Sequence, residues 1–185
     1  MKRRNFIGGI LSAIALMGTT IKAKSEEVKI IQTDEEDFYD FFNKFNGFPI
    51  AFSQKSYYYW YKKDFLKMTM GRQSGTTTFL TTLAAYKTLG GEVVSYFTFS
   101  EHHKKYCRDI YMINMINFKE KYPGMGCEPT EPLFLSNVDG IRGKYPSIAL
   151  FDNWSNTIYP RTIFDYLKAK KTKVFWIDTV EYDVV

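Results

Sequence analysis

The chain has 185 residues, of which 45% are hydrophobic and 18% aromatic. This size and apolar content suit one folded domain with a core, and 16 Phe and 14 Tyr residues exclude a disordered, solvated chain. Two cysteines exclude a disulfide scaffold and a four-cysteine zinc site. We identify no acidic partner for the adjacent residues His102 and His103, which argues against a metal site at this pair. The net charge of +5 first points to an acidic partner such as nucleic acid or a membrane surface.

The positive charge is concentrated in residues 1–23, which carry four basic residues and no acidic residue. The other 162 residues have 21 basic and 20 acidic side chains, so the body of the chain is close to neutral. Lys2-Arg3-Arg4 followed by the apolar run 6–17 is typical of a targeting leader, and the run is too short to span a bilayer as a helix. The twin arginines also resemble a bacterial export signal, with Ala23 at a possible cleavage point. The alternatives are a basic amphipathic helix or an apolar tail that packs locally.

Residues 24–56 are predicted to form an N-terminal helical extension. Val28 to Ile31 could form a short strand, and Thr33 with Glu36 makes a capping box. Four phenylalanines then follow at helical spacing before Gly47 and Pro49 end the helix: Phe38, Phe41, Phe42 and Phe45.

Five consecutive aromatic residues, Tyr57 to Tyr61, begin the next part of the chain. Such a run could stack on nucleic-acid bases, or it could form a buried strand or the start of a buried helix. We favour the buried element because only Lys62 and Lys63 flank the run.

From residue 65 onward, apolar strand-like runs alternate with helical patterns. Strands are predicted at 65–70, 92–99, 133–135, 148–151 and 174–179, and helices at 77–89, 100–118 and 161–170. Ser100 is the expected N-cap of the second of these helices, whose buried stripe is predicted as Tyr106, Ile110, Ile113 and Ile116. The alternation predicts an α/β fold for residues 57–185, with a mainly parallel sheet sandwiched by helices.

The segment 71–78 lies between a predicted strand and a predicted helix, where a phosphate-binding loop belongs. Its glycines would let backbone N–H groups turn toward an anion. The Walker pattern ends in Gly-Lys-Ser/Thr, and here Thr76 replaces the lysine while Thr77 can still offer a hydroxyl to Mg²⁺. The alternative is a purely structural turn. The nucleotide-binding candidates are Gly71, Arg72, Gln73, Ser74, Gly75, Thr76, Thr77 and Thr78.

A second candidate motif is the apolar run 148–151 followed by Asp152 and Asn153. A buried strand that ends in Asp has the form of a Walker B element, with the Asp on Mg²⁺. Many such sites continue with a Glu that orients water, whereas Asn153 can hydrogen-bond water but cannot take its proton. The candidate metal ligands are thus Thr77 and Asp152, and the candidate catalytic residues are Asp152, Asn153 and Arg72. An ordinary strand-to-turn junction is the alternative.

In this order, the motifs resemble the ATPase domain of the large terminase subunit, the P-loop DNA-packaging motor of tailed phages. That family has a loop Arg-Gln-x-Gly-Lys-Thr, and this chain has Arg72 to Thr77 there. The family segment Ser-x-x-Asp-x-Val/Ile-Arg-Gly matches residues 136–143. Residues 61–66 correspond to a stretch near the adenine, with Lys62 in place of Gln, and 174–179 to the coupling strand. The resemblance covers about residues 57–180.

The resemblance implies ATP and Mg²⁺ as cofactors, phage packaging proteins as partners with DNA contacted through them, and a location in the cytoplasm of the bacterial host. The family's loop lysine and Walker B glutamate are replaced here by Thr76 and Asn153. Losing a charged hydrogen-bond partner costs about 1.5–3 kcal/mol, so we expect weak or no ATP hydrolysis. Arg72 or Arg142 could supply part of the missing positive charge. The nuclease domain that follows the ATPase in the family has no room in 185 residues. Homo-oligomers are possible, and the near-neutral body argues against strong independent DNA binding.

The rival hypothesis is an exported or membrane-associated binding protein, without enzymatic activity, that uses a P-loop-like scaffold. The leader at 1–23 is the feature that favours it. Cleavage near Ala23 would contradict a cytoplasmic motor.

Overall fold

The computed structural model describes residues 35–64, 67–71, 74–125, 130–137, 139–141, 143–154 and 160–180. The predicted leader, the strand at 28–31 and the Thr33 cap lie outside these residues. The helices are α2 (Glu35–Asn46), α3 (Phe52–Lys62), α4 (Thr76–Leu89), α5 (Glu101–Lys121) and α6 (Pro160–Ala169), with a 3-10 turn η1 at Asp139–Ile141. The strands are β1 (Lys67–Gly71), β2 (Val94–Thr98), β3 (Leu133–Leu135), β4 (Ile148–Asp152) and β5 (Lys173–Val180).

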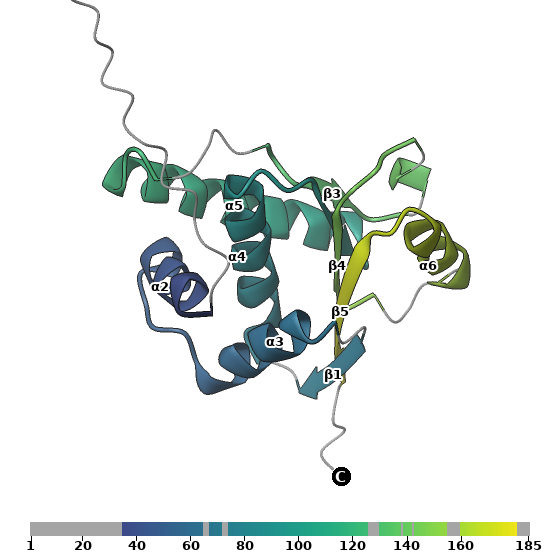
Figure 1. Ribbon diagram of the computed structural model, residues 1–185, viewed down its shortest axis with the longest axis horizontal. Coiled ribbons are helices and arrows are strands. Elements are labelled where there is room, and N and C mark those ends of the chain that lie inside the picture. Colours follow the sequence, from purple (N-terminus) through teal and green to yellow (C-terminus); the bar gives the residue numbers. More distant parts are fainter. Residues whose placement is uncertain are drawn as a thin grey trace, which may run out of the picture.

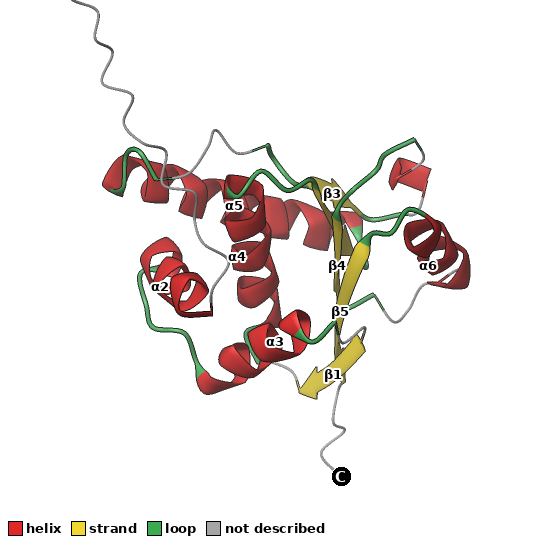
Figure 2. Cartoon of the chain, viewed as in Figure 1, coloured by secondary structure: helices red, strands yellow, loops and turns green. Residues whose placement is uncertain are grey.

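The five strands form one sheet in the order β1-β5-β4-β2-β3, and every neighbouring pair is parallel. The α/β fold with a parallel sheet, predicted from the alternation of strands and helices, is confirmed (Figures 1 and 2). In the register of the central strands, Asp152 at the end of β4 lies beside Thr98 of β2 and Ile177 of β5. Residues far apart in the sequence therefore meet at the carboxyl edge of the sheet.

Helices cover both faces of the sheet, so its central strands are buried on both sides. All five residues of β4 and all five of β2 are buried. Ile148 and Leu150 face a core shared with α2 to α5, while Ala149 and Phe151 face a second core shared with α6. Figure 1 shows the same division, with α4 and α5 on one side of the sheet and α6 on the other. This burial explains why β4 reads as a continuous apolar run.

The helices before the sheet belong to the first core. Phe38 of α2 stacks on Tyr58 of α3 with ring centroids 4.0 Å apart, and it meets Phe79 of α4 edge-on at 5.8 Å. The four phenylalanines predicted to line one face of α2 are all buried. The boundary predicted between residues 56 and 57 falls inside α3, and α2 and α3 share one core with the sheet.

The aromatic run forms the second half of α3. Tyr57, Tyr58 and Tyr61 are buried, whereas Tyr59 and Trp60 are partly exposed. Helical periodicity separates these two groups, because residues three and four apart share a face. The buried element favoured from the sequence is therefore correct.

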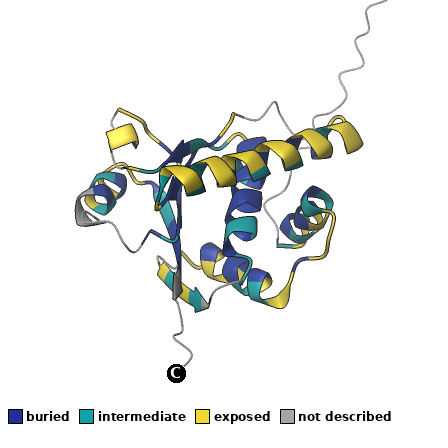
Figure 3. Ribbon diagram, turned by 180° about the vertical axis from the view of Figure 1, so that it is seen from behind, coloured by how far each residue is buried: buried dark blue, intermediate teal, exposed yellow. Residues whose placement is uncertain are grey.

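Helix α5 begins where predicted, since Ser100 caps it by accepting a hydrogen bond from the backbone N–H of His103 at 3.1 Å. Its predicted buried stripe is wrong. Tyr106, Ile113 and Ile116 are each more than half exposed, and Figure 3 shows this outer face. The buried face is shifted by one or two residues along the sequence and comprises Cys107, Tyr111, Met115 and Phe118. Both stripes have helical spacing, and aromatic partners such as Phe41 and Phe134 favour the second one.

In the part of the chain that the structure describes, no helix combines the length and the apolar character needed to cross a membrane.

Candidate functional site at the carboxyl edge of the sheet

The site lies where two neighbouring strands send their helices to opposite faces of the sheet. The chain leaves β2 for α5, which packs in the first core, and leaves β4 for α6, which packs in the second. In open parallel sheets such a switch point leaves a crevice beyond the carboxyl ends of the strands, and ligands bind there. Asp152 ends β4 at this point.

The structure brings together the two residues predicted to hold a metal. Thr77 lies in the first turn of α4, and its hydroxyl donates a hydrogen bond to Oδ2 of Asp152 at 2.8 Å. The two residues are 75 positions apart in the sequence. In P-loop NTPases the hydroxyl of the loop and the Walker B carboxylate hold Mg²⁺ together, and this contact has the form of that pair.

Asp152 is buried, with 1% of its surface exposed, and several groups contact its Oδ2 atom. Besides Thr77, the phenol of Tyr96 donates to it at 2.9 Å, and Nε2 of His103 lies 3.0 Å away. Burying a carboxylate is costly unless donors compensate it, and these three groups do so. Burial, followed by the charge of Asp152, raises the pKa of Tyr96 well above its usual value, so this phenol stays a donor.

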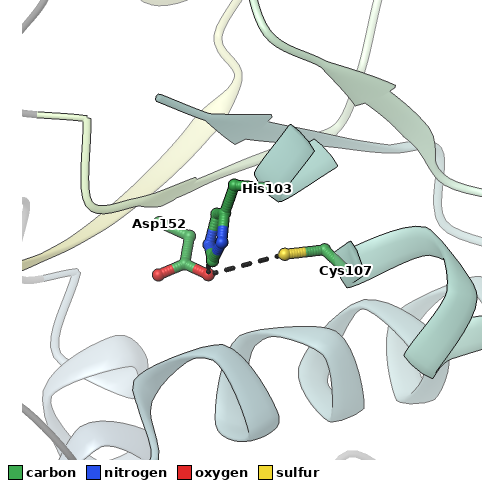
Figure 4. Close-up of side chains that lie close together, drawn as sticks. All are labelled: His103, Cys107 and Asp152. Carbon is green, nitrogen blue, oxygen red and sulfur yellow. Dashed lines mark hydrogen bonds and ion pairs between the residues drawn. The ribbon is translucent and has the colours of Figure 1, made fainter. Parts of the chain in front are cut away.

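A histidine and a cysteine of α5 complete the cluster around Asp152 (Figure 4). His103 and Cys107 are four residues apart, so they share one face of the helix. Sγ of Cys107 lies 3.8 Å from Oδ2 of Asp152, and the Cys107 side chain is fully buried. Burial, and then the charge of Asp152, raises the pKa of this thiol.

This geometry corrects the sequence-based view that His103 lacks an acidic partner. Asp152 provides one from 49 positions away, because β2 and β4 pair side by side in the sheet. The ring of His103 is also held between aromatic neighbours, with Phe99 at 4.8 Å and Tyr106 at 6.0 Å between ring centroids.

The end of the loop is held by α3. Nε2 of Gln54 donates to the carbonyl of Gly75 at 3.3 Å, and the phenol of Tyr57 donates to the carbonyl of Ser74 at 3.2 Å. Gly75 has φ of 73°, a left-handed conformation that favours glycine, and a Cβ there would lie 2.6 Å from the Gln54 amide nitrogen and displace that side chain. Oγ of Ser74 is buried and has no hydrogen-bond partner among the described residues.

The remaining loop positions play different parts. Gly71 ends β1, and Thr76, predicted from the sequence to replace the Walker lysine, is buried in the first turn of α4. The backbone carbonyl of Thr78 accepts hydrogen bonds from the hydroxyls of Thr81 and Thr82, at 3.1 and 2.7 Å. The predicted residues Arg72, Gln73 and Arg142 lie outside the described residues.

Asn153 follows Asp152 in a left-handed backbone conformation, with φ of 53°. Its backbone N–H donates to the carbonyl of Ile177 at 2.9 Å, which fixes the turn after β4. Asparagine adopts this conformation far more readily than glutamate. The local backbone thus gives a structural reason for Asn at the position where a Walker B motif often has Glu.

Tyr61 and Asp64, from the stretch that the resemblance places near the adenine, lie before the amino end of β1. Tyr61 packs against Phe175 in the core, and Asp64 pairs with Lys173, the first residue of β5, at 2.6 Å. Gln54 and Tyr57 contact the loop instead. The assignment of residues 61–66 to a stretch near the adenine stays a prediction.

Five residues of the site were not identified from the sequence: Gln54, Tyr57, Tyr96, His103 and Cys107. Only the last two carry a local signal, since a histidine and a cysteine four apart on one predicted helix can face a common ligand. The others depend on which strands and helices become neighbours.

Comparison with known proteins adds no relative. No family model matches the chain, and neither the curated proteins nor the solved structures gave a significant match. The likeness to the terminase ATPase domain remains a prediction from motifs, and function has to be argued from the geometry around Asp152.

Proposed function

We propose that the chain binds a nucleoside triphosphate with Mg²⁺ at the carboxyl edge of its sheet and hydrolyses it weakly or not at all. The observation that carries the proposal is the 2.8 Å contact between the Thr77 hydroxyl and Asp152. It joins the first turn of the helix after β1 to the end of β4, as a Mg²⁺-nucleotide site requires.

The loop fits a bound anion. The Oγ of Ser74, which is buried and has no hydrogen-bond partner in the described part of the chain, has the capacity to meet a phosphate oxygen. Gly75 keeps the backbone free of a Cβ at the start of α4. The helix N-terminus adds partial positive charge at the same place. The loop from Gly71 to Thr78 would hold the phosphates, and Thr77 with Asp152 would hold Mg²⁺, which bridges phosphate oxygens and neutralises their charge.

The residues around the site argue for binding rather than rapid turnover. Thr76 brings no positive charge to the phosphates, and Asn153 cannot accept a proton from an attacking water. Each missing charged contact costs about 1.5–3 kcal/mol, which is about ten- to a hundredfold in rate or affinity.

The packaging lineage is the wider part of this proposal. The order of the motifs at 72–77, 136–143 and 148–153 supports a terminase-like P-loop protein of the bacterial cytoplasm that contacts a functional packaging motor. Its contact with DNA would then run through other packaging proteins.

The test is Mg²⁺-ATP titration by calorimetry with the full chain and two threonine variants. We expect Thr77→Val to weaken binding by about tenfold or more, because it removes the hydroxyl that reaches the metal. Thr81→Val is the matched control: Thr81 lies one turn along the same helix, and among the described residues its hydroxyl bonds to two backbone carbonyls and to no side chain. No binding at millimolar Mg²⁺-ATP, or equal binding by the two variants, would contradict the proposal.

A further inference from the structure

The ligand-type atoms of His103, Cys107 and Asp152 lie within 4.8 Å of one another. Oδ2 of Asp152 is 3.0 Å from Nε2 of His103 and 3.8 Å from Sγ of Cys107. A tetrahedral zinc ion, with bonds of about 2.0–2.3 Å, places its ligand atoms roughly 3.3–3.8 Å apart. The two separations from Asp152 come within a few tenths of an ångström of that spacing, and the separation between His103 and Cys107 is at most 4.8 Å. Side-chain shifts of up to about 1 Å would therefore close the site.

We propose that His103, Cys107 and Asp152 form a binding site for a borderline-soft divalent cation of the zinc class. One imidazole, one thiolate and one carboxylate are ligands that Zn²⁺ accepts, whereas Mg²⁺ prefers oxygen alone. This site shares Asp152 with the proposed Mg²⁺-nucleotide site, but none of its three ligands comes from the loop, and the inference does not rest on nucleotide binding.

Charge balance favours this cation in so buried a place. A thiolate and a carboxylate supply two negative charges, a neutral imidazole supplies none, and the divalent ion makes the loaded site neutral overall. Neutrality matters because Cys107 and Asp152 are 0% and 1% exposed, and unbalanced charge there is expensive. The thiol proton leaves to solvent when the metal binds.

The surroundings hold the three ligands in place. The hydroxyls of Thr77 and Tyr96 fix the carboxylate of Asp152, and α5 carries the other two ligands on one face. Such supporting contacts orient the ligands of real metal sites. The side chain of His103 is 18% exposed, so the cluster is open to entering ions on this side.

The competing explanation is that the cluster only satisfies the buried carboxylate. Thr77, Tyr96 and His103 already give Asp152 three donors, and Cys107 at 3.8 Å adds at most a weak one. The metal hypothesis also explains why a fully buried thiol, that of Cys107, points at the same Asp152 oxygen as His103.

The experiment is a Co²⁺ titration of the full chain without a histidine tag, in a Cys127→Ser background that removes the other cysteine. Tetrahedral Co²⁺ bound to a thiolate gives a near-ultraviolet charge-transfer band, which reports the Cys107 ligand directly. We expect one Co²⁺ per chain, displaced by Zn²⁺. Cys107→Ser should abolish the band, and His103→Ala should weaken affinity by about tenfold or more.

His102→Ala is the matched control, because His102 neighbours His103 on α5, is exposed, and has no part in the cluster. It should bind Co²⁺ like the parent. Zn²⁺ should also raise the melting temperature of the parent and of His102→Ala, but not of His103→Ala, a readout that holds even if Cys107→Ser folds poorly. A titration without the charge-transfer band, or equal binding by His102→Ala and His103→Ala, would overturn the inference.

The two proposals can fail separately. Thr77→Val should weaken Mg²⁺-ATP binding more than Co²⁺ binding, because Thr77 supports Asp152 but is not a ligand of the second cation. His103→Ala should lose Co²⁺ and keep Mg²⁺-ATP. Nucleotide binding by the parent without a Co²⁺ band refutes the zinc-class site alone. A Co²⁺ band without nucleotide binding refutes the proposed function alone.

Discussion

At the scale of single residues, the backbone of Asn153 limits what can follow the site carboxylate. Its φ of 53° is a conformation that costs most side chains about 1–2 kcal/mol. We expect Asn153→Glu to lower the free energy of unfolding by about that amount, while Asn153→Gly, which relieves the restriction, should not. Urea denaturation of the parent and both variants measures the difference. A Glu variant as stable as the parent would show that the turn relaxes freely.

Cys107 gives a second prediction at this scale. It is fully buried, and burial together with Asp152 raises its pKa, so its reactive thiolate is scarce in the folded protein. In the Cys127→Ser variant without added metal, alkylation by iodoacetamide at pH 8 should be slow when folded and should reach the rate of an ordinary cysteine in urea. Mass spectrometry follows the modification. Rapid alkylation of the folded chain would mean that Cys107 is accessible.

Only some residues of the site could be predicted from the sequence. Thr77 and Asp152 were predicted because each sits at a recognisable place, after a loop and at the end of a buried strand. Tyr96 gave no local signal, and the spacing of His103 and Cys107 did not point to Asp152, because all three contacts arise from the pairing of β2 with β4. That pairing is a long-range property that no local pattern of either strand reveals.

At the scale of elements, the position of α5 along the chain was predicted correctly, but its buried face was not. Its start, its cap and its length follow from local chemistry, whereas the choice between two apolar stripes depends on what packs beside it. For the sheet, burial could be predicted as well as position. A parallel sheet covered by helices is buried on both faces, so a strand with an apolar pattern leaves no choice of face.

The two faces of α5 should differ sharply when truncated. Phe118 packs on Phe41 at 5.1 Å and is 2% exposed, so Phe118→Ala should cost about 3–5 kcal/mol of unfolding free energy. Ile113 is 58% exposed, so Ile113→Ala should stay within about 0.5 kcal/mol of the parent. Chemical denaturation of both variants tests this. A large cost at Ile113 would indicate that the outer face of α5 is covered in solution.

At the scale of the whole molecule, many of the aromatic residues that excluded disorder are buried together in the core. Tyr61 and Tyr96 are buried with the phenylalanines, and burial is the main cause that raises the pKa of both phenols. In the unfolded chain these groups ionise near pH 10. Above that pH the unfolded state therefore holds fewer protons than the folded state.

The sign of this linkage makes the protein sensitive to alkali. Stability from the two phenols is fully present below about pH 10 and is lost as pH rises through the raised folded values, at about 1 kcal/mol per phenol between pH 10 and 11. Urea denaturation at pH 8, 10 and 11 measures the loss. Tyr61→Phe is a clean comparison, because no hydrogen bond of the Tyr61 phenol occurs among the described residues, and it should show a shallower decline. Equal stability at pH 8 and 11, or an unchanged decline in Tyr61→Phe, would mean that these phenols reach solvent in the folded protein.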